Sequence, residues 1–361
     1  MLDFENTRMM NTRLLSVSGG GLLGVIPAAI LMRYEALGRT AYGADYRLCD
    51  SFDAVAGSST GAVIAAGIAL GLPAQDIANF YLRDVPRGFK RKRLALPLIH
   101  DIFDGDLMER FFEARTRGCL MERRALECDL TIMVKDLGRG TPLAFTTRKS
   151  PISNLLGAEI CTEAQPLARV LRASTAAPGL FSPVEMALDG VGPTLLADGG
   201  FSLFNDPSYL ASRLAMAQGA TGIDLTVLGT GSARPPHKAR IKRRGPSIGR
   251  ALHALFGLIG EGEILSEALV TQLGGLPGFD MSVRRHDMRL TAETFETIGA
   301  PATRSELREM RRFADFKGKV QLYEAATLLA KQTIHAPLPL KANRQMPNTH
   351  MIDTSELISA N

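Results

Sequence analysis

Short apolar runs, glycine turns and longer helical patterns alternate along the first part of the chain. The apolar run at 14–17 ends in a glycine turn at 18–21, and residues 22–37 then follow a helical pattern. The same order recurs over residues 52–70, where the glycine turn occupies 57–61. Two strand–turn–helix units in succession predict an α/β fold, with a central, mostly parallel sheet flanked by helices.

The remaining pattern extends this fold and suggests how the chain is divided. We expect one α/β domain over residues 10–232, a helical C-terminal extension packed on it at 233–335, and a flexible tail at 336–361, which is polar and punctuated by prolines. Further strands are predicted at 130–134, 143–147, 195–197 and 225–228, and helices at 167–174, 250–269 and 304–331.

Composition excludes a wholly disordered chain, and the net charge gives no sign of a nucleic-acid-binding protein. Of the 361 residues 45% are hydrophobic and 22% are charged, which are ordinary globular values. The net charge of +5 is too mild to imply nucleic acid without a motif. The first residues are acidic and polar where a signal peptide would be basic and then apolar, and the apolar runs at 14–17 and 61–72 are shorter than the ~20 residues of a membrane span. We therefore expect a cytoplasmic protein whose membrane contact, if any, is peripheral.

The cysteines show no metal or redox motif. None of the four forms a Cys-x-x-Cys pair, so we expect free thiols in a reducing compartment and neither a metal nor a cofactor. They are Cys49, Cys119, Cys128 and Cys161.

The second glycine turn carries the first candidate for chemistry. Gly57-Ser58-Ser59-Thr60-Gly61 matches G-x-S-x-G, with Ser59 at the serine position. A nucleophile elbow has this pattern because its serine occupies a strained strand-to-helix turn, where flanking glycines such as Gly57 and Gly61 remove steric clashes. Small residues gather in many such turns, so the signal depends on its place between a strand and an apolar helix. We interpret Ser59 as a candidate nucleophile.

The first glycine turn carries the second candidate. Gly19, Gly20 and Gly21 expose consecutive backbone N–H groups, which can form an oxyanion hole beside a helix start. A tight turn without function and a nucleotide-binding loop are the alternatives. The nucleotide fingerprint is matched only loosely, through Gly24, and no Gly-Lys-[Ser/Thr] follows, so a P-loop is excluded.

The third candidate is Asp198-Gly199-Gly200, after a short apolar run. A carboxylate there could act as the general base for Ser59, whereas an aspartate that merely begins a turn is the alternative. No histidine lies in a glycine turn or at a convincing strand end, which favours a Ser–Asp dyad over a Ser–His–Asp triad, although a distant histidine stays open. The histidines are His100, His237, His253, His286, His335 and His350.

Together these motifs resemble the patatin-like phospholipase family in their order and spacing. Three further segments strengthen the resemblance: residues 173–183 ahead of the aspartate, Asn205-Asp206-Pro207 after it, and the glycine turn at 228–231. The resemblance covers about residues 13–232. It implies the family's three-layer fold, with a central sheet between helices.

The resemblance also implies an activity and a substrate class. The chain would be a serine acyl hydrolase of phospholipase A or lysophospholipase type, acting on a phospholipid or another acyl-ester lipid without a cofactor. Ser59 would attack an ester carbonyl after Asp198 takes its proton, and water would then release the fatty acid from an acyl-enzyme. A free aspartate, with a pKa of ~3.9, is a weak base, so we expect the site to strengthen it by partial burial.

Two positions depart from the family's glycine loop. Ser18 replaces its usual aspartate and Leu23 its usual arginine. An oxyanion hole consists of backbone amides, so we expect an intact catalytic pair with altered substrate choice. The alternative is a regulated effector or binding protein of this fold, activated by a nucleotide, in which hydrolysis is altered or lost. A hydrolase with a full triad is a second enzyme alternative.

Two basic clusters are candidates for contact with anions. The first surrounds Phe89 and could contact anionic lipid at ~1 kcal/mol per basic residue, with a solvated loop as the alternative. The second has the same two interpretations and could also bind a phosphate-bearing regulator, while the sequence leaves a homo-oligomer open. The first consists of Arg87, Lys90, Arg91, Lys92 and Arg93, and the second of Lys238, Arg240, Lys242, Arg243 and Arg244.

Overall fold

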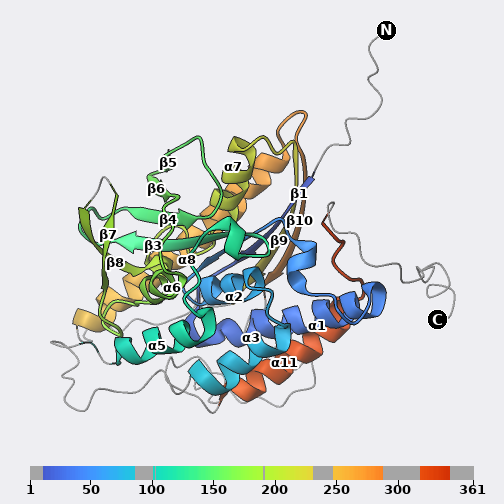
Figure 1. Cartoon of the computed structure of the whole chain (residues 1–361), viewed down its shortest axis with the longest axis horizontal. Coiled ribbons are helices and arrows are strands. Elements are labelled where there is room, and N and C mark those ends of the chain that lie inside the picture. Colours follow the sequence, from blue (N-terminus) through green and yellow to red (C-terminus); the bar gives the residue numbers. More distant parts are fainter. Residues whose placement is uncertain are drawn as a thin grey trace, which may run out of the picture.

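A large sheet lies between two layers of helices (Figure 1). The structure is a computed structural model that describes residues 11–85, 101, 103–189, 192–230, 247–287 and 318–341. Its strands are β1 (Asn11–Val17), β2 (Ala54–Ser58), β3 (Asp129–Asp136), β4 (Pro142–Thr146), β5 (Asn154–Leu155), β6 (Ala158–Cys161), β7 (Val184–Leu188), β8 (Gly192–Asp198), β9 (Gly222–Gly229) and β10 (Asp280–Asp287). Its α-helices are α1 (Val25–Tyr42), α2 (Thr60–Ala69), α3 (Ala74–Asn79), α5 (Gly105–Thr116), α6 (Leu167–Ser174), α7 (Ser208–Ala217), α8 (Ser247–Gly274) and α11 (Gly318–Thr333).

The sheet is mostly parallel, which confirms the predicted fold class. Its strand order is β10-β9-β1-β2-β3-β4-β6-β5, and the first five of these strands run parallel. Strand β4 pairs antiparallel with one edge of β3. Where β2 ends, β8 pairs antiparallel with β3, and β7 continues from β8. The C-terminal end of β8 therefore faces the C-terminal end of β2 along the same edge of β3.

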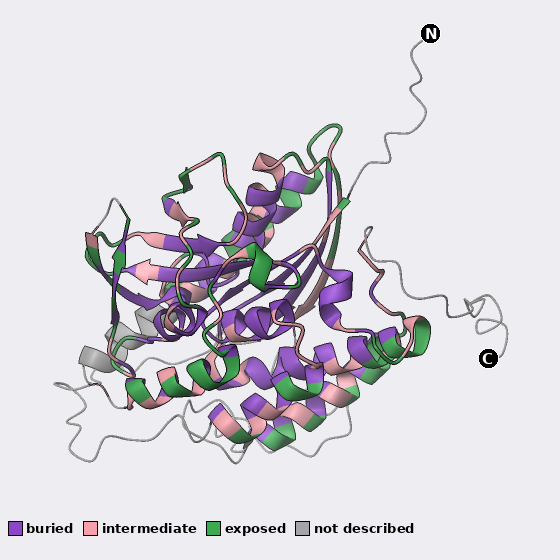
Figure 2. Ribbon diagram, in the orientation of Figure 1, coloured by how far each residue is buried: buried purple, intermediate pink, exposed green. Residues whose placement is uncertain are grey.

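Side chains along the strands point alternately to the two faces of the sheet. Leu15 and Val17 of β1 belong to the larger core cluster, with buried residues of α1, α2, α3, α5, α6 and α11. Leu14 points to the opposite side and packs with apolar residues of α7, β9 and α8. This alternation is what the two faces of a strand require. The sheet is accordingly buried throughout its centre (Figure 2).

Helix α1 belongs to the one segment among the described residues with the length and apolarity of a membrane span. The run Gly21–Tyr42 is long and apolar enough to cross a membrane by length and composition alone, but 67% of its apolar window is buried inside the protein. It packs between the sheet and α11, and also against α3 (Figure 1). Its apolarity is therefore accounted for by its place in the core.

Strand β10 lies in the segment for which the sequence predicts only helices. It pairs with β9 at the edge of the sheet, so this part of the chain belongs to the sheet itself. A hydrophobicity pattern does not reveal this strand because several of its residues are charged. Their side chains form ion pairs: Arg284 contacts Asp224, and Arg285 contacts Asp206. Charged residues are typical of edge strands.

The chain is held against the domain past the point where the sequence predicts a flexible tail. Leu338 is buried, and the N–H of Lys341 donates to the carbonyl of Asp50 at 2.8 Å. The division of the chain into domains stays a prediction, and residues 342–361 lie outside the described residues.

Two glycines allow α2 to follow β2 closely and to pack against β1. A Cβ at Gly61 would lie 2.0 Å from the carbonyl oxygen of Val17, and a Cβ at Gly57 would lie 2.2 Å from that of Gly61. Both neighbours are backbone atoms that cannot move aside as a side chain could. The elbow therefore requires glycine at these positions for packing as well as for conformation.

Gly61→Ala should destabilise the protein by about 1–3 kcal/mol, because the added methyl group overpacks against β1. The matched control is Gly257→Ala in α8, where an added Cβ meets nothing within 4 Å. There alanine should stabilise the helix by about 1 kcal/mol through its higher helix propensity. Thermal unfolding of the two variants and the wild type measures both shifts. Equal melting temperatures for the two variants would contradict the packing argument.

Candidate active site

Ser59 occupies a backbone conformation that non-glycine residues rarely adopt. Its φ is 53° and its ψ is −122°, between the last residue of β2 and the first residue of α2. Such strain persists only where surrounding structure enforces it, and it is typical of a nucleophile at a strand-to-helix turn. The turn lifts the hydroxyl out of the sheet, yet Ser59 remains 8% exposed. The elbow predicted at 57–61 therefore has the expected geometry.

Strand β8 brings Asp198 to this hydroxyl from the opposite direction. Ser58 at the end of β2 pairs with Met133 of β3, and Asp198 at the end of β8 pairs with Val134, the next residue of the same strand. The C-terminal ends of β2 and β8 therefore meet on the same edge of β3. Ser59 Oγ donates a hydrogen bond of 2.7 Å to Asp198 Oδ2, across 139 positions of sequence.

The surroundings of Asp198 make its carboxylate a stronger base. Burial raises the pKa of Asp198 to about 7, while hydrogen bonds from Ser59 Oγ and the Gly200 N–H counteract part of this rise. The Gly200 N–H donates to Oδ1 at 2.7 Å, so one oxygen is held by the turn and the other faces Ser59. At neutral pH the carboxylate can therefore accept a proton and later return it.

The amide of Ser59 is also fixed by a buried side chain. Ser174, at the end of α6, accepts a hydrogen bond from the Ser59 N–H at 3.0 Å and donates to the carbonyl of Met133 at 2.7 Å. Ser174 thereby connects the elbow to β3, the strand on which β2 and β8 meet. It belongs to the segment 173–183 that resembles the family, but nothing in the sequence alone assigns it this role.

The glycine loop lies beside Ser59, and its three amides are not equivalent. The Gly19 N–H donates to the carbonyl of Asn205 at 3.1 Å, so it is already engaged. Within the described part of the chain, the N–H groups of Gly20 and Gly21 have no hydrogen-bond acceptor, and Gly21 lines the same cavity as Ser59. Of the three predicted oxyanion donors, Gly20 and Gly21 are thus the better candidates. The Ser18 N–H donates to Leu228.

The side chains of Asn205 and Thr230 both bind the carbonyl oxygen of Gly19. The Asn205 side chain donates to the Gly19 carbonyl at 3.4 Å, and Thr230 Oγ1 donates to the same oxygen at 2.7 Å. Asn205 also donates to Glu263 of α8 at 2.6 Å. Burial, helped by the nearby charge of Asp206, raises the pKa of Glu263 to about 8. The glycine loop is therefore fixed by residues that follow Asp198 and β9.

Asp206, the neighbour of Asn205, connects this part of the chain to the sheet. Its buried carboxylate accepts hydrogen bonds from Ser16 Oγ of β1 at 3.1 Å and from Arg285 of β10 at 2.9 Å. A buried carboxylate is costly unless it is paired in this way. The sequence singles out Asn205 and Asp206 by resemblance only, and it gives no sign of Arg285 or Glu263 as their partners.

An apolar cavity of about 50 Å³ opens beside the Ser59–Asp198 pair. It extends from the reacting groups between α2, α5 and the π-helical turn Phe80–Asp84 that follows α3. Tyr81 of this turn is hydrogen bonded to Thr60, the residue after Ser59, at 2.7 Å in both directions. The apolar walls of this cavity include Val63, Phe80, Val85, Met108, Phe112 and Phe181.

The remaining candidates lie elsewhere or outside the described residues. His286 is bound to the Tyr34 hydroxyl at 2.6 Å and His335 to the carbonyl of Gln332, so neither contacts Ser59 or Asp198. Over the described ranges, no group of three His, Cys, Asp or Glu side chains could hold a metal ion. Both predicted basic clusters, 87–93 and 238–244, fall outside the described residues, as do His100, His237 and His350.

Comparisons with known proteins find related sequences. A family model described as patatin-like phospholipase matches residues 15–211, which is more than half of the chain. Patatin-like protein 1 of Oryza sativa subsp. indica is 31% identical over 215 residues, 55% of this chain and 50% of that protein. Patatin-like protein 2 of Arabidopsis thaliana is 28% identical over 214 residues, 55% of this chain and 51% of that protein. The matches thus span about half the length of these curated relatives.

A search of solved structures gives a more distant likeness. The crystal structure of VipD from Legionella pneumophila aligns with 88% of this chain and 67% of its own, at 12% identity and a TM-score of 0.35.

The reactivity of Ser59 toward a fluorophosphonate should rise with pH and level off above an inflection near 7, because Asp198 must be ionised to accept the serine proton. Labelling rates between about pH 6 and 8 measure this inflection. Asp198→Asn should label slowly, without the inflection. Glu263→Gln should keep it, which assigns the titration to Asp198 instead of Glu263. A wild-type rate that does not change over this range would contradict the assignment.

Asn205→Ala should lower the labelling rate of Ser59 by between about tenfold and a hundredfold, because a small displacement of the glycine loop misplaces the oxyanion donors. Thr230→Ser, which keeps the hydroxyl that binds the Gly19 carbonyl, is the matched control and should react close to the wild-type rate. The experiment compares labelling rates with melting temperatures. If Asn205→Ala labels as fast as the wild type, Asn205 does not position the loop.

Proposed function

Because the chain belongs to the patatin-like phospholipase family, we propose that it is a serine acyl hydrolase that cleaves fatty-acyl esters of membrane lipids. The observation that carries this proposal is the hydrogen bond of 2.7 Å between Ser59 Oγ and Asp198 Oδ2, at the end of an apolar cavity. A strained serine, a buried carboxylate and an apolar wall together suit an ester with a hydrocarbon chain. The finer assignment, phospholipase A or lysophospholipase type, rests on this cavity and on the family.

The first half of the proposed reaction forms an acyl-enzyme. Asp198 Oδ2 takes the proton of Ser59 as Oγ attacks the carbonyl carbon of the ester. The carbonyl oxygen gains the negative charge, which the N–H groups of Gly20 and Gly21 and the N-terminal end of α2 stabilise. When the tetrahedral intermediate collapses, the bond to the alcohol oxygen breaks. The alcohol leaves with the proton that Asp198 returns.

The second half releases the fatty acid. Water occupies the place of the departed alcohol and gives a proton to Asp198 as its oxygen attacks the acyl carbon. Collapse of this intermediate breaks the bond to Ser59 Oγ, which recovers the proton from Asp198. The carboxylate of Asp198 thus acts as base and then as acid in each half, which suits a group whose pKa lies at about 7.

We place the protein in the cytoplasm with peripheral contact to the membrane, as a proposal that the sequence alone supports. The basic residues that would make this contact, Arg87, Lys90, Arg91, Lys92 and Arg93, lie outside the described residues.

Ser59→Ala should abolish hydrolysis of a short-chain ester, since it removes the attacking oxygen. Its neighbour provides the matched control: Ser58 Oγ is buried without a hydrogen-bond partner among the described residues, so Ser58→Ala removes an unsatisfied hydroxyl and should keep most of the activity. Asp198→Asn should fall close to Ser59→Ala, because groups that act as one unit are not additive. A colorimetric ester assay measures all three.

One outcome would overturn the proposed function, and another would overturn the proposed dyad. Equal turnover by the wild type and Ser59→Ala would mean that this site does not hydrolyse esters and would favour a binding or effector role. A loss of about 10⁴-fold on replacing His286 or another histidine would favour a triad instead of the dyad.

A further inference from the structure

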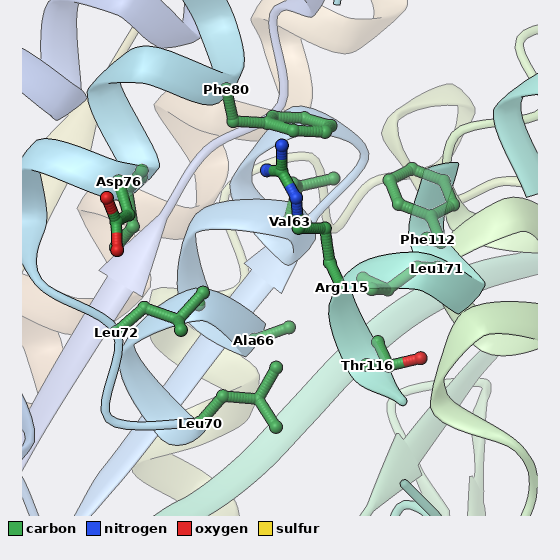
Figure 3. Close-up of a pocket in the computed structure, with 12 residues that line it drawn as sticks. Val63, Ala66, Leu70, Leu72, Asp76, Phe80, Phe112, Arg115, Thr116 and Leu171 are labelled. Atoms are coloured by element: carbon green, nitrogen blue, oxygen red, sulfur yellow. The ribbon is translucent and has the colours of Figure 1, made fainter. Parts of the chain in front are cut away.

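A second apolar cavity lies directly behind the first. Its volume is about 40 Å³, and residues of α2, α3, α5 and α6 line it (Figure 3). Its walls are apolar, and the charged side chains of Asp76 and Arg115 stand at its border. Residues that line it without touching the first cavity include Ala66, Leu70, Leu72 and Leu171.

Three side chains line both cavities: Val63, Phe80 and Phe112. The rings of Phe80 and Phe112 are tilted by 30° to each other, with their centroids 6.2 Å apart, which is within the range of an aromatic pair in contact. Both residues are buried, at 7% and 2% exposure. The aromatic pair therefore stands between the cavity that contains Ser59 and the cavity behind it.

Arg115 holds the Phe80 ring in this position. Its guanidinium carbon lies 5.7 Å from the centroid of Phe80, and Figure 3 shows the group directed at the ring. The same guanidinium forms an ion pair with Asp84, which lies in the same π-helical turn as Phe80. Phe112 and Arg115 are three positions apart on α5 and thus share one face of the helix. One helix supplies both the second ring and the group that braces the first.

We propose that Phe80 and Phe112 determine the length of the acyl chain that the site accepts, an inference that rests on the proposed function. A chain bound by its ester at Ser59 lies along the apolar walls of the first cavity and ends at the two rings. Each buried methylene group favours binding only while apolar surface remains to receive it. Chains that reach the rings gain nothing from further carbons, because the second cavity is closed to them.

The test is a series of p-nitrophenyl esters of butyrate, octanoate, dodecanoate and palmitate, assayed below their aggregation limits. In the wild type, kcat/KM should rise with chain length and then stop rising. Phe112→Ala joins the two cavities, so the rise should continue to longer esters, by up to about fourfold for each additional methylene, which corresponds to about 0.8 kcal/mol per buried methylene. Phe112→Leu, a milder change, should shift the limit in the same direction if the alanine variant does not fold.

Two further variants separate a change of specificity from a loosened core. Ala66→Leu, added to Phe112→Ala, fills the second cavity and should restore the wild-type limit. Phe52→Leu makes the same change as Phe112→Leu at a buried site (2% exposed) that lines neither cavity, so its profile should match that of the wild type.

The outcomes distinguish this inference from the proposed function. If the wild type shows no Ser59-dependent hydrolysis of any ester, the proposed function fails. The inference alone is overturned if hydrolysis is present but the limit stays at the same ester in the Phe112 variants. It is also overturned if Phe52→Leu shifts the limit equally, or if Ala66→Leu does not reverse the shift.

Discussion

The close approach of α2 to the carboxyl end of β1 is the constraint on which the rest of the site depends. Gly61 lies against the Val17 carbonyl, and Gly57 against the backbone of Gly61, with no room for a side chain at either position. The chain between them must turn within a few residues, and Ser59 absorbs that turn in its strained backbone. The same packing sets the glycine loop after β1 beside the serine hydroxyl.

Burial of Asp198 gives the site both its chemistry and its cost. A carboxylate that is removed from water holds its proton to higher pH, and this makes Asp198 a better base at neutral pH than an exposed aspartate. The charged form disfavours the folded state, so the protein holds it with hydrogen bonds from Ser59 and Gly200. These bonds also orient the carboxylate toward the serine. The function that we propose needs this compromise between stability and basicity.

The residues around the pair form two supports with different tasks. On one side Asn205, Thr230 and the Asp206–Arg285 ion pair fix the glycine loop, where charge would develop on the substrate oxygen. On the other side the π-helical turn and α5 build an apolar wall, where a hydrocarbon chain would lie. Polar groups and apolar walls thus meet at the Ser59–Asp198 pair, as the proposed cleavage of a fatty-acyl ester requires.

The sequence by itself determined the parallel α/β core, the strand-to-helix turn at Ser59 and the glycine turn at 18–21. Each of these depends on local periodicity or on the conformations of a few adjacent residues, which a single chain displays openly. Only the tertiary structure decided how Asp198 reaches Ser59, because this depends on β8 pairing with the end of β3. The same holds for Ser174, Asn205 and Arg285, whose partners lie far along the chain. It also holds for β10, because its charged residues suit an edge strand but are equally typical of a loop. Contacts between distant residues leave no pattern in the sequence, since either partner alone is an ordinary polar residue.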